Sequence, residues 1–345
     1  MKSLLFFALL FSAALQALPK GSTLYPLPDG ALHVRLMQPD SQKTQQVDTA
    51  IVLIAGPNEY FFADSGFFAL LQPVLAKHHR TYAVDRQSSG FSSDTATPSY
   101  RRFAKDLAQV LPQLQAKKFL LVSFASGSIT ARLLADDPAI APRLHGLLLL
   151  DPDVPTPAAL ELYNGAPADW YRAHLLELLP ELAKGVWNDR TAKKISAELT
   201  QIRQLVPTAQ QQLTDWDYLQ QLQASRLPVN RQQARAIEIA QYQADLAAYS
   251  QTPWQQSAVP VSVVDGDFEA PLIAEAKEDK ARLARWRQDG LEFAATLAKN
   301  SGGRFVALPA QNHLLMFSHS AELTQLIDEL IAAPAGAASG NSARR

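Results

Sequence analysis

Cysteine is absent from this chain of 345 residues. Its absence excludes disulfide bridges, thiolate metal ligands and a cysteine nucleophile. Seven His residues are present, but none of them shows the spacing of a metal site. We therefore expect neither a bound metal nor a cofactor. A chain of this length buries a core large enough to fold without disulfides.

A surplus of charge of one sign is also missing. Lys and Arg number 32, Asp and Glu number 33, and the formal net charge is −1. Proteins that bind nucleic acid usually carry a basic surplus. The composition therefore favours a protein without a nucleic-acid partner.

The apolar run near the N-terminus, Leu4–Leu15, is short. A membrane helix needs about 20 apolar residues, so we expect no stable membrane span. Lys2 precedes the run, and small residues, Ala17 among them, mark its end. This pattern is typical of a secretory signal peptide. We expect cleavage after Ala17 and export to the periplasm or the medium.

Short β-branched or leucine-rich runs alternate with helical patterns in the first half of the chain. Continuous apolar strands that are separated by helices predict a parallel sheet covered on both faces. An alternating stretch at Leu32–Leu36 predicts an antiparallel strand at the sheet edge. The runs expected to form parallel strands are 50–54, 81–84, 119–122 and 147–150.

This alternation stops near Pro155 and resumes at Val259–Val264 and Arg304–Leu308. The segment between them is rich in Leu, Gln and Ala and has helical spacing, so we interpret it as a helical cap inserted after the sixth strand. The expected organisation is a signal peptide (1–17), a first part of the core (18–154), the cap (155–255), a second part of the core (256–332) and a disordered tail (333–345).

Ligands of parallel α/β sheets bind at the carboxyl ends of the strands, so the turns at those ends are the candidate sites. Such turns contain glycine, serine, carboxylate or histidine side chains at five places. They are 54–58, 85–92, 122–128, 266–269 and 312–313.

These five turns, in this order, resemble the α/β-hydrolase superfamily, most closely its cap-bearing esterase and proline-iminopeptidase-like branches, over about residues 30 to 332. Asp85, Gly90 and Ser92 match that family's D-x-x-G-x-G-x-S motif, and Ser88 replaces its first Gly. The resemblance implies a mostly parallel, doubly wound sheet. It also implies an oxyanion turn, a nucleophile elbow, a cap, an acid and a terminal histidine.

The nucleophile position carries no nucleophile. Aligning Ser123 to Gly127 with the G-x-S-x-G elbow places Ala125 in the serine position,. Ser126 is the alternative nucleophile, but that register has the bulky Phe124 where the tight turn needs a small residue. Ser126 is better suited to opening the next helix.

The oxyanion turn departs from the family pattern too. The resemblance implies that the residue after Gly56 donates its backbone N–H, but this residue is Pro57, which has none,. Losing one such donor typically costs about 10²–10³ in rate. Asn58 is the candidate to compensate. Tyr60 and Phe61 follow and are candidates for the wall of an apolar pocket.

The acid and the base of the triad are present. Glu269 matches the family's acid position, with Asp267 and Asp151 as fallbacks, and His313 matches the terminal base. A histidine held by a carboxylate accepts a proton even without a serine beside it.

Three functions remain open, because this fold hosts all of them. The first is a degenerate hydrolase that binds a small molecule or peptide between core and cap. The second is an active hydrolase of ester or peptide-like substrates, using Ser126 or a water activated by His313 and Glu269. The third is an interaction protein that acts through its cap.

Overall fold

The computed structural model describes residues 18–42, 47–56, 64–251 and 257–333. The expected signal peptide and the tail beyond residue 333 lie outside these ranges, as do Pro57, Asn58, Tyr60 and Phe61. Within the ranges, no helix has both the length and the apolar character needed to cross a membrane.

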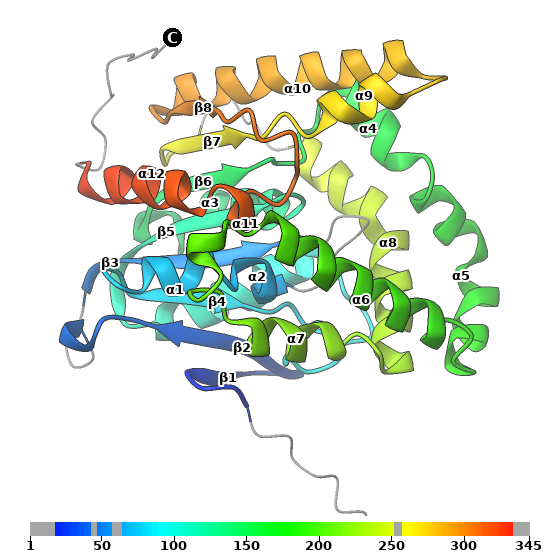
Figure 1. The fold of residues 1–345 in the computed structure, drawn as a ribbon, viewed down its shortest axis with the longest axis horizontal. Helices are drawn as coiled ribbons and strands as arrows, with labels where there is room; N and C mark the ends of the chain where they lie inside the picture. Colours follow the sequence, from blue (N-terminus) through cyan, green and yellow to red (C-terminus); the bar gives the residue numbers. More distant parts are fainter. Residues whose placement is uncertain (1–17, 43–46, 57–63, 252–256, 334–345) are drawn as a thin grey trace, which may run out of the picture.

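A sheet of eight strands forms the centre of the described structure (Figure 1), in the order β1-β2-β4-β3-β5-β6-β7-β8. β1 and β2 pair antiparallel, as do β2 and β4, whereas every pair from β4 to β8 is parallel. This topology confirms the predicted fold class. The strands are β1 Ser22–Leu27, β2 Gly30–Met37, β3 Val47–Ala55, β4 Thr81–Val84, β5 Ala116–Phe124, β6 Leu144–Leu150, β7 Val261–Asp265 and β8 Phe305–Ala307.

Both faces of the sheet are covered, which explains why its central strands are apolar throughout. Val52 on β3 packs into one core with α2 and α3, and its neighbour Leu53 packs into the other with α1 and α12. Side chains alternate between faces along a strand, so each face needs its own apolar set. The helices of the two layers are α1 Leu71–Leu75, α2 Tyr100–Val110, α3 Gly127–Asp136, α9 Glu269–Glu275, α10 Lys280–Ser301, α11 Leu315–Ser318 and α12 Ser320–Ala332.

Among the described residues between β6 and β7, five α-helices form the cap, as the sequence pattern predicts. They stand together at one end of the sheet (Figure 1), with α5 farthest from the core. α5 packs mainly on α8, which in turn contacts α2, α3 and α4. The cap helices are α4 Pro157–Asn164, α5 Ala168–Ala183, α6 Asn188–Leu205, α7 Trp216–Ala224 and α8 Val229–Ser250.

The structure corrects three boundaries. The edge strand is β1, which the sequence pattern missed, and β2 lies inside it. The helical pattern that begins at Tyr100 ends at Val110, because Pro112 has no N–H for the helical ladder and β5 begins at Ala116,. The helical sequence after β7 forms two helices, α9 and α10, with a break before the left-handed Asp279.

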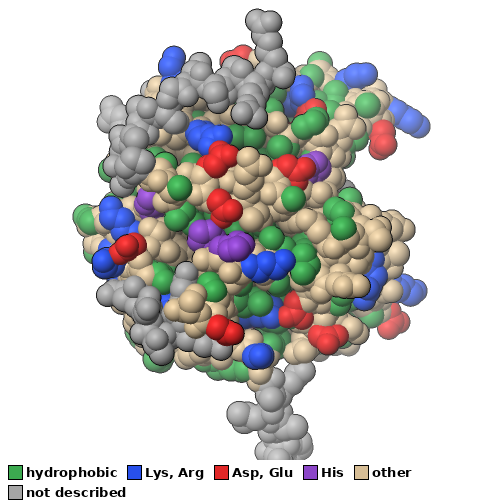
Figure 2. Space-filling model, turned by 60° about the vertical axis from the view of Figure 1, so that its left-hand side comes forward, with side chains coloured by type: hydrophobic (Ala, Val, Ile, Leu, Met, Phe, Trp, Pro, Cys, Tyr) green, Lys and Arg blue, Asp and Glu red, His purple; other side chains and the backbone are tan. Residues whose placement is uncertain are grey.

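Charged side chains of both signs are mixed on the surface. The face in Figure 2 shows acidic and basic groups interspersed with apolar and neutral ones, without a large area of one sign. The balance seen in the composition therefore also holds locally on this face.

Candidate active site

The chain turns sharply from β5 into α3 at Ala125, whose φ of +49° lies in the left-handed region. Such a conformation in a residue other than glycine costs about 1–3 kcal/mol and is found at functional sites. A Cβ on Gly56 would lie only 2.3 Å from the backbone N of Gly127, so the neighbouring strand passes very close. The strained turn of a nucleophile elbow is therefore present, with a methyl group at its tip.

Of the two serines beside this turn, one is hydrogen-bonded to an aspartate and the other is buried. Ser126 Oγ donates to Asp153 Oδ2 at 2.5 Å and lies 3.2 Å from the hydroxyl of Tyr242. Ser123 is fully buried. Across the described residues, neither hydroxyl hydrogen-bonds His313. Ser126 is thus oriented toward Asp153 rather than toward a base.

His313, in the loop after β8, forms a dyad with Asp151 at the end of β6. Its Nδ1 lies 3.0 Å from Asp151 Oδ2, and the other carboxylate oxygen accepts from the backbone N of Gly266 at 2.5 Å. A carboxylate only accepts, so the proton of this bond is assigned to Nδ1 and the lone pair to Nε2. His313 is therefore set up as a proton acceptor.

The acid partner differs from the sequence expectation. Glu269, the favoured candidate, makes no hydrogen bond to His313 in the described structure, and the fallback Asp151 does. The ring of Phe268 packs beside His313, with 4.0 Å between the two ring centroids. The other fallback, Asp267, accepts from Arg287 Nε at 2.6 Å.

Glu269 remains close to the dyad, but its carboxyl is protonated at neutral pH. Burial raises the pKa of its carboxyl to about 8, and the nearby charges of Asp265 and Asp151 act in the same direction. Its Oε2 is buried without a hydrogen-bond partner among the described residues. At neutral pH Glu269 therefore carries a proton that it can donate.

The cap reaches down to the elbow through α8. Tyr242 donates its hydroxyl proton to Asp153 Oδ2, and Tyr249 donates to the backbone oxygen of Asp153 at 2.7 Å. Ala125 beside them is only 2% exposed. Sequence reasoning missed Asp153, although its position two residues after Asp151, in the same turn, was a signal.

A buried ion cluster also holds α8 on the core. Arg86, which follows β4, donates to Asp64 at 2.9 Å and to Glu238 of α8 at 2.5 Å. Arg235, one turn earlier on α8, donates to the same Glu238 at 2.9 Å. Breaking a buried pair of this kind typically costs about 3–5 kcal/mol. The cap is therefore firmly attached at this point.

The turn between β4 and α2 contains the motif residues Asp85, Gly90 and Ser92, and its geometry explains why these residue types occur there. A Cβ on Gly90 would lie 2.0 Å from Asp85 Oδ2, and φ of Gly90 is +51°, so only glycine fits,. Ser92 Oγ donates to the backbone oxygen of Asp85 at 2.7 Å. Ser88, which stands where the family has glycine, is left-handed at φ +63° and accepts from the N of Thr95 at 2.8 Å.

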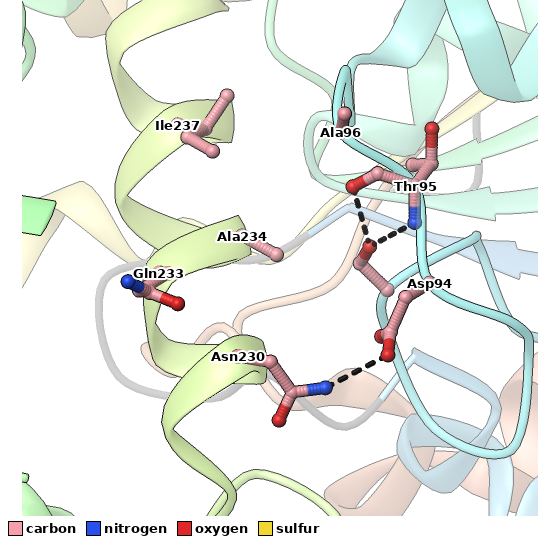
Figure 3. A pocket seen from close by; sticks show the side chains of 8 residues that line it. Asp94, Thr95, Ala96, Asn230, Gln233, Ala234 and Ile237 are labelled. Atoms are coloured by element: carbon pink, nitrogen blue, oxygen red, sulfur yellow. Dashed lines mark hydrogen bonds between the residues drawn. The ribbon is translucent and has the colours of Figure 1, made fainter. Parts of the chain in front are cut away.

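Ala125 is not among the lining residues of two cavities that lie elsewhere on the described structure. One, of about 310 Å³, lies where the loop after β4 meets α8, and Figure 3 shows side chains of both facing it. There Asn230 donates to Asp94 at 2.7 Å. This first cavity is lined by Ser88, Asp94, Thr95, Ala96, Asn230, Gln233, Ala234 and Ile237. The other cavity, of about 270 Å³, lies between α4 and α10.

The described residues contain no cluster of three or more His, Asp or Glu suited to a metal ion.

Comparisons with known proteins support the same fold. A search of curated proteins gives no match to this chain. Among solved structures, it is similar to a hydrolase from Pseudomonas aeruginosa PA01, with 16% identity, 91% of this chain and 100% of that one covered, and a TM-score of 0.54. It is also similar to an α/β-hydrolase fold protein from Burkholderia ambifaria, with 18% identity and a TM-score of 0.60. That match covers 89% of this chain and 97% of the other. A third similar structure is an epoxide hydrolase from Vigna radiata, with 12% identity and a TM-score of 0.61. That match covers 90% of this chain and 97% of the other.

Likeness at these identities shows the fold alone, and the family follows from the sequence. The model of the alpha/beta hydrolase family matches residues 51–326, which contain the elbow, the cap, Asp151 and His313. The chain therefore belongs to the alpha/beta hydrolase family.

Proposed function

We propose that this protein is a degenerate serine hydrolase, which binds a small molecule or a peptide between core and cap without forming an acyl-enzyme at the elbow. The observation that carries the proposal is Ala125, at φ +49° on an otherwise complete elbow. A methyl group cannot attack a carbonyl carbon. The neighbouring hydroxyl of Ser126 is bonded to Asp153 and does not replace the missing one.

The parts around the elbow support a history as a hydrolase. The strained turn, the close approach of Gly56 and the His313–Asp151 dyad serve acyl transfer in this family,. Pro57 removes one oxyanion donor by its chemistry alone, because proline has no N–H. We infer that the covalent step was lost while the strained turn and the His313–Asp151 dyad were kept.

The test is labelling of the wild-type protein with a fluorophosphonate, followed by peptide mapping. We expect no label on the elbow peptide that contains Ser123 and Ser126. Stoichiometric label on either serine would overturn the proposal and establish an active serine hydrolase. Ser126→Ala is the matched control, because it removes that hydroxyl and leaves Ala125 in place.

A second function has its own observation in its favour, the intact dyad beside a protonated carboxyl. His313 Nε2 would take a proton from water, and Glu269, with its pKa near 8, would give one to the leaving group,. Ester hydrolysis by wild type that is insensitive to fluorophosphonate but abolished in His313→Gln would establish this route. If both variant and wild type are inactive, the route is excluded.

Export belongs to the same proposal. Lys2 and the apolar run Leu4–Leu15 are the observations that favour it. N-terminal sequencing of the protein from the periplasm or the medium should give Leu18 as the first residue. An intact Met1 in a membrane fraction would contradict export.

A further inference from the structure

A second chain of Ser, His and Asp side chains lies at the opposite side of the sheet from β7 and β8. Ser22 Oγ on β1 lies 2.7 Å from His33 Nε2 on β2, and His33 Nδ1 lies 2.7 Å from Asp85 Oδ2 after β4. His33 and Asp85 are fully buried, whereas Ser22 is partly exposed on the edge strand. The three residue types and the two bonds are those of a catalytic triad.

The direction of the two hydrogen bonds follows from Asp85. Its carboxylate also accepts from the backbone N of Ser65 at 3.0 Å and from that of Phe91 at 3.1 Å. Burial alone would raise the pKa of Asp85, but His33 and these donors hold it below its usual value. An ionised carboxylate only accepts, so the proton on His33 is assigned to Nδ1 and the lone pair to Nε2.

With the lone pair on Nε2, Ser22 donates its hydroxyl proton to His33,. In a serine hydrolase the same direction prepares the nucleophile, because the base takes that proton as the oxygen attacks. A serine with a purely structural bond is satisfied by any acceptor. Here the acceptor is an imidazole, the side chain that most often serves as a general base.

Arg35 supplies a group for the developing negative charge. It lies directly opposite Ser22 in the β1–β2 register, so both side chains are on the same face of the sheet,. Its Nη2 donates to Asp215, and its guanidinium lies 3.7 Å from the ring centroid of Tyr218. In the part of the chain that the structure describes, its Nε and Nη1 have no hydrogen-bond partner, although Arg35 is only 4% exposed.

Buried N–H groups without an acceptor are costly, which points to an acceptor that arrives with a ligand. The backbone before Ser22 is also fixed. Gly21, at φ +82°, is so close to Leu36 that a Cβ would lie 2.4 Å from its carbonyl oxygen. Ser22 N donates to the oxygen of Pro19 at 3.0 Å. The backbone that carries this hydroxyl is thus fixed.

We propose that Ser22, His33 and Asp85 form a second nucleophilic centre, which takes acyl groups from small carboxylic esters independently of the elbow. Ser22 Oγ bonds to the acyl carbon while its proton passes to His33 Nε2, and Arg35 donates to the carbonyl oxygen as it becomes negative. The bond to the alcohol oxygen then breaks, and the alcohol leaves with the proton from His33. Water repeats the sequence on the acyl-serine and releases the acid.

The first test is fluorophosphonate labelling of the full-length wild-type protein, with the labelled peptide identified by mass spectrometry. We expect label on the peptide that contains Ser22. Ser22→Ala should lose it, while Thr23→Ala and Ser126→Ala should keep it, since Thr23 is the adjacent exposed residue of β1 and Ser126 belongs to the elbow. No label on Ser22 in folded wild type would overturn the proposal, and label at the elbow would instead overturn the proposed function.

The second test uses the absence of native cysteine. Ser22→Cys and Thr23→Cys each create one unique thiol, and iodoacetamide reacts with the thiolate. If His33 takes the proton, Ser22→Cys should be alkylated at pH 7 roughly tenfold faster than Thr23→Cys, although it is less exposed. Equal or slower alkylation, with both variants folded by circular dichroism, would overturn the role of His33.

Discussion

The elbow and the β1–β2 edge each have features of a serine-hydrolase site that the other lacks. At the elbow, the fold provides the strained turn, the cap and the His313–Asp151 dyad, but the nucleophile is a methyl group. At the edge, Ser22, His33 and Asp85 form the full hydrogen-bonded chain without an elbow, beside Tyr218 of the cap helix α7. The comparison shows that position in the fold and chemistry of the side chains are separate requirements.

The largest expected effect comes from restoring the missing hydroxyl. Ala125→Ser should create esterase activity toward small activated esters, because the turn and the dyad are in place. The rate should rise by several powers of ten over wild type, as removal of a triad member costs that much. Hydrolysis of p-nitrophenyl acetate measures it. His313→Ala in the same background should abolish the gain, and His319→Ala should not.

If folded Ala125→Ser shows neither added esterase activity nor fluorophosphonate label on the elbow peptide, then the elbow has lost more than its nucleophile. The comparison would then favour the edge centre or a function of the cap.

The next effect distinguishes the two candidate acids. In the Ala125→Ser background, Asp151→Asn should lower kcat by about 10³–10⁴, since the dyad then holds the wrong tautomer of His313. Glu269→Gln is the matched control and should change kcat far less, because Glu269 does not contact His313. The reverse order would return the acid role to Glu269.

A smaller effect concerns the oxyanion turn. Adding Pro57→Gly to Ala125→Ser should raise kcat further, by up to about 10²-fold, because glycine supplies the N–H that proline lacks. Ester hydrolysis rates of the single and double variants measure the difference. An unchanged rate would mean that this N–H does not reach the oxyanion.

The smallest effect is on stability. Burial raises the pKa of Glu269 from 4.5 to about 8, so the folded state holds a proton that the unfolded state releases. Its contribution is therefore present below pH 4.5 and is lost as the pH rises to about 8. Urea unfolding at pH 5 and pH 8.5 should show that wild type loses more free energy of unfolding than Glu269→Gln does. Equal losses would contradict the raised pKa.

Much of the fold was accessible from the sequence because the signals are local. The continuous apolar runs at β3 to β6 and the helical spacing of α5 and α8 depend on residues close in the chain. β1 was missed because Ser22–Leu27 is only half buried at the edge and contains Pro26, which weakens a strand pattern,. The elbow was recognised because its steric needs fix the residue types around it.

The dyad was harder to assign because it depends on packing between distant segments. Asp151 and Glu269 both follow strands and both carry a carboxylate, so spacing alone does not distinguish them. What distinguishes them is the hydrogen bond between Asp151 and His313, a contact between two loops that only the folded chain reveals. The same holds for Ser22 and Asp85, which lie far apart in the sequence.

The attachment of α8 has a consequence for the kinetics of ligand exchange. With Glu238 bonded to Arg86 and with Tyr242 and Tyr249 bonded to Asp153, lifting this helix means separating several buried polar pairs at once. Ligands of any bulk should consequently have long residence times, and their off-rate should accelerate when Glu238 is replaced by Gln.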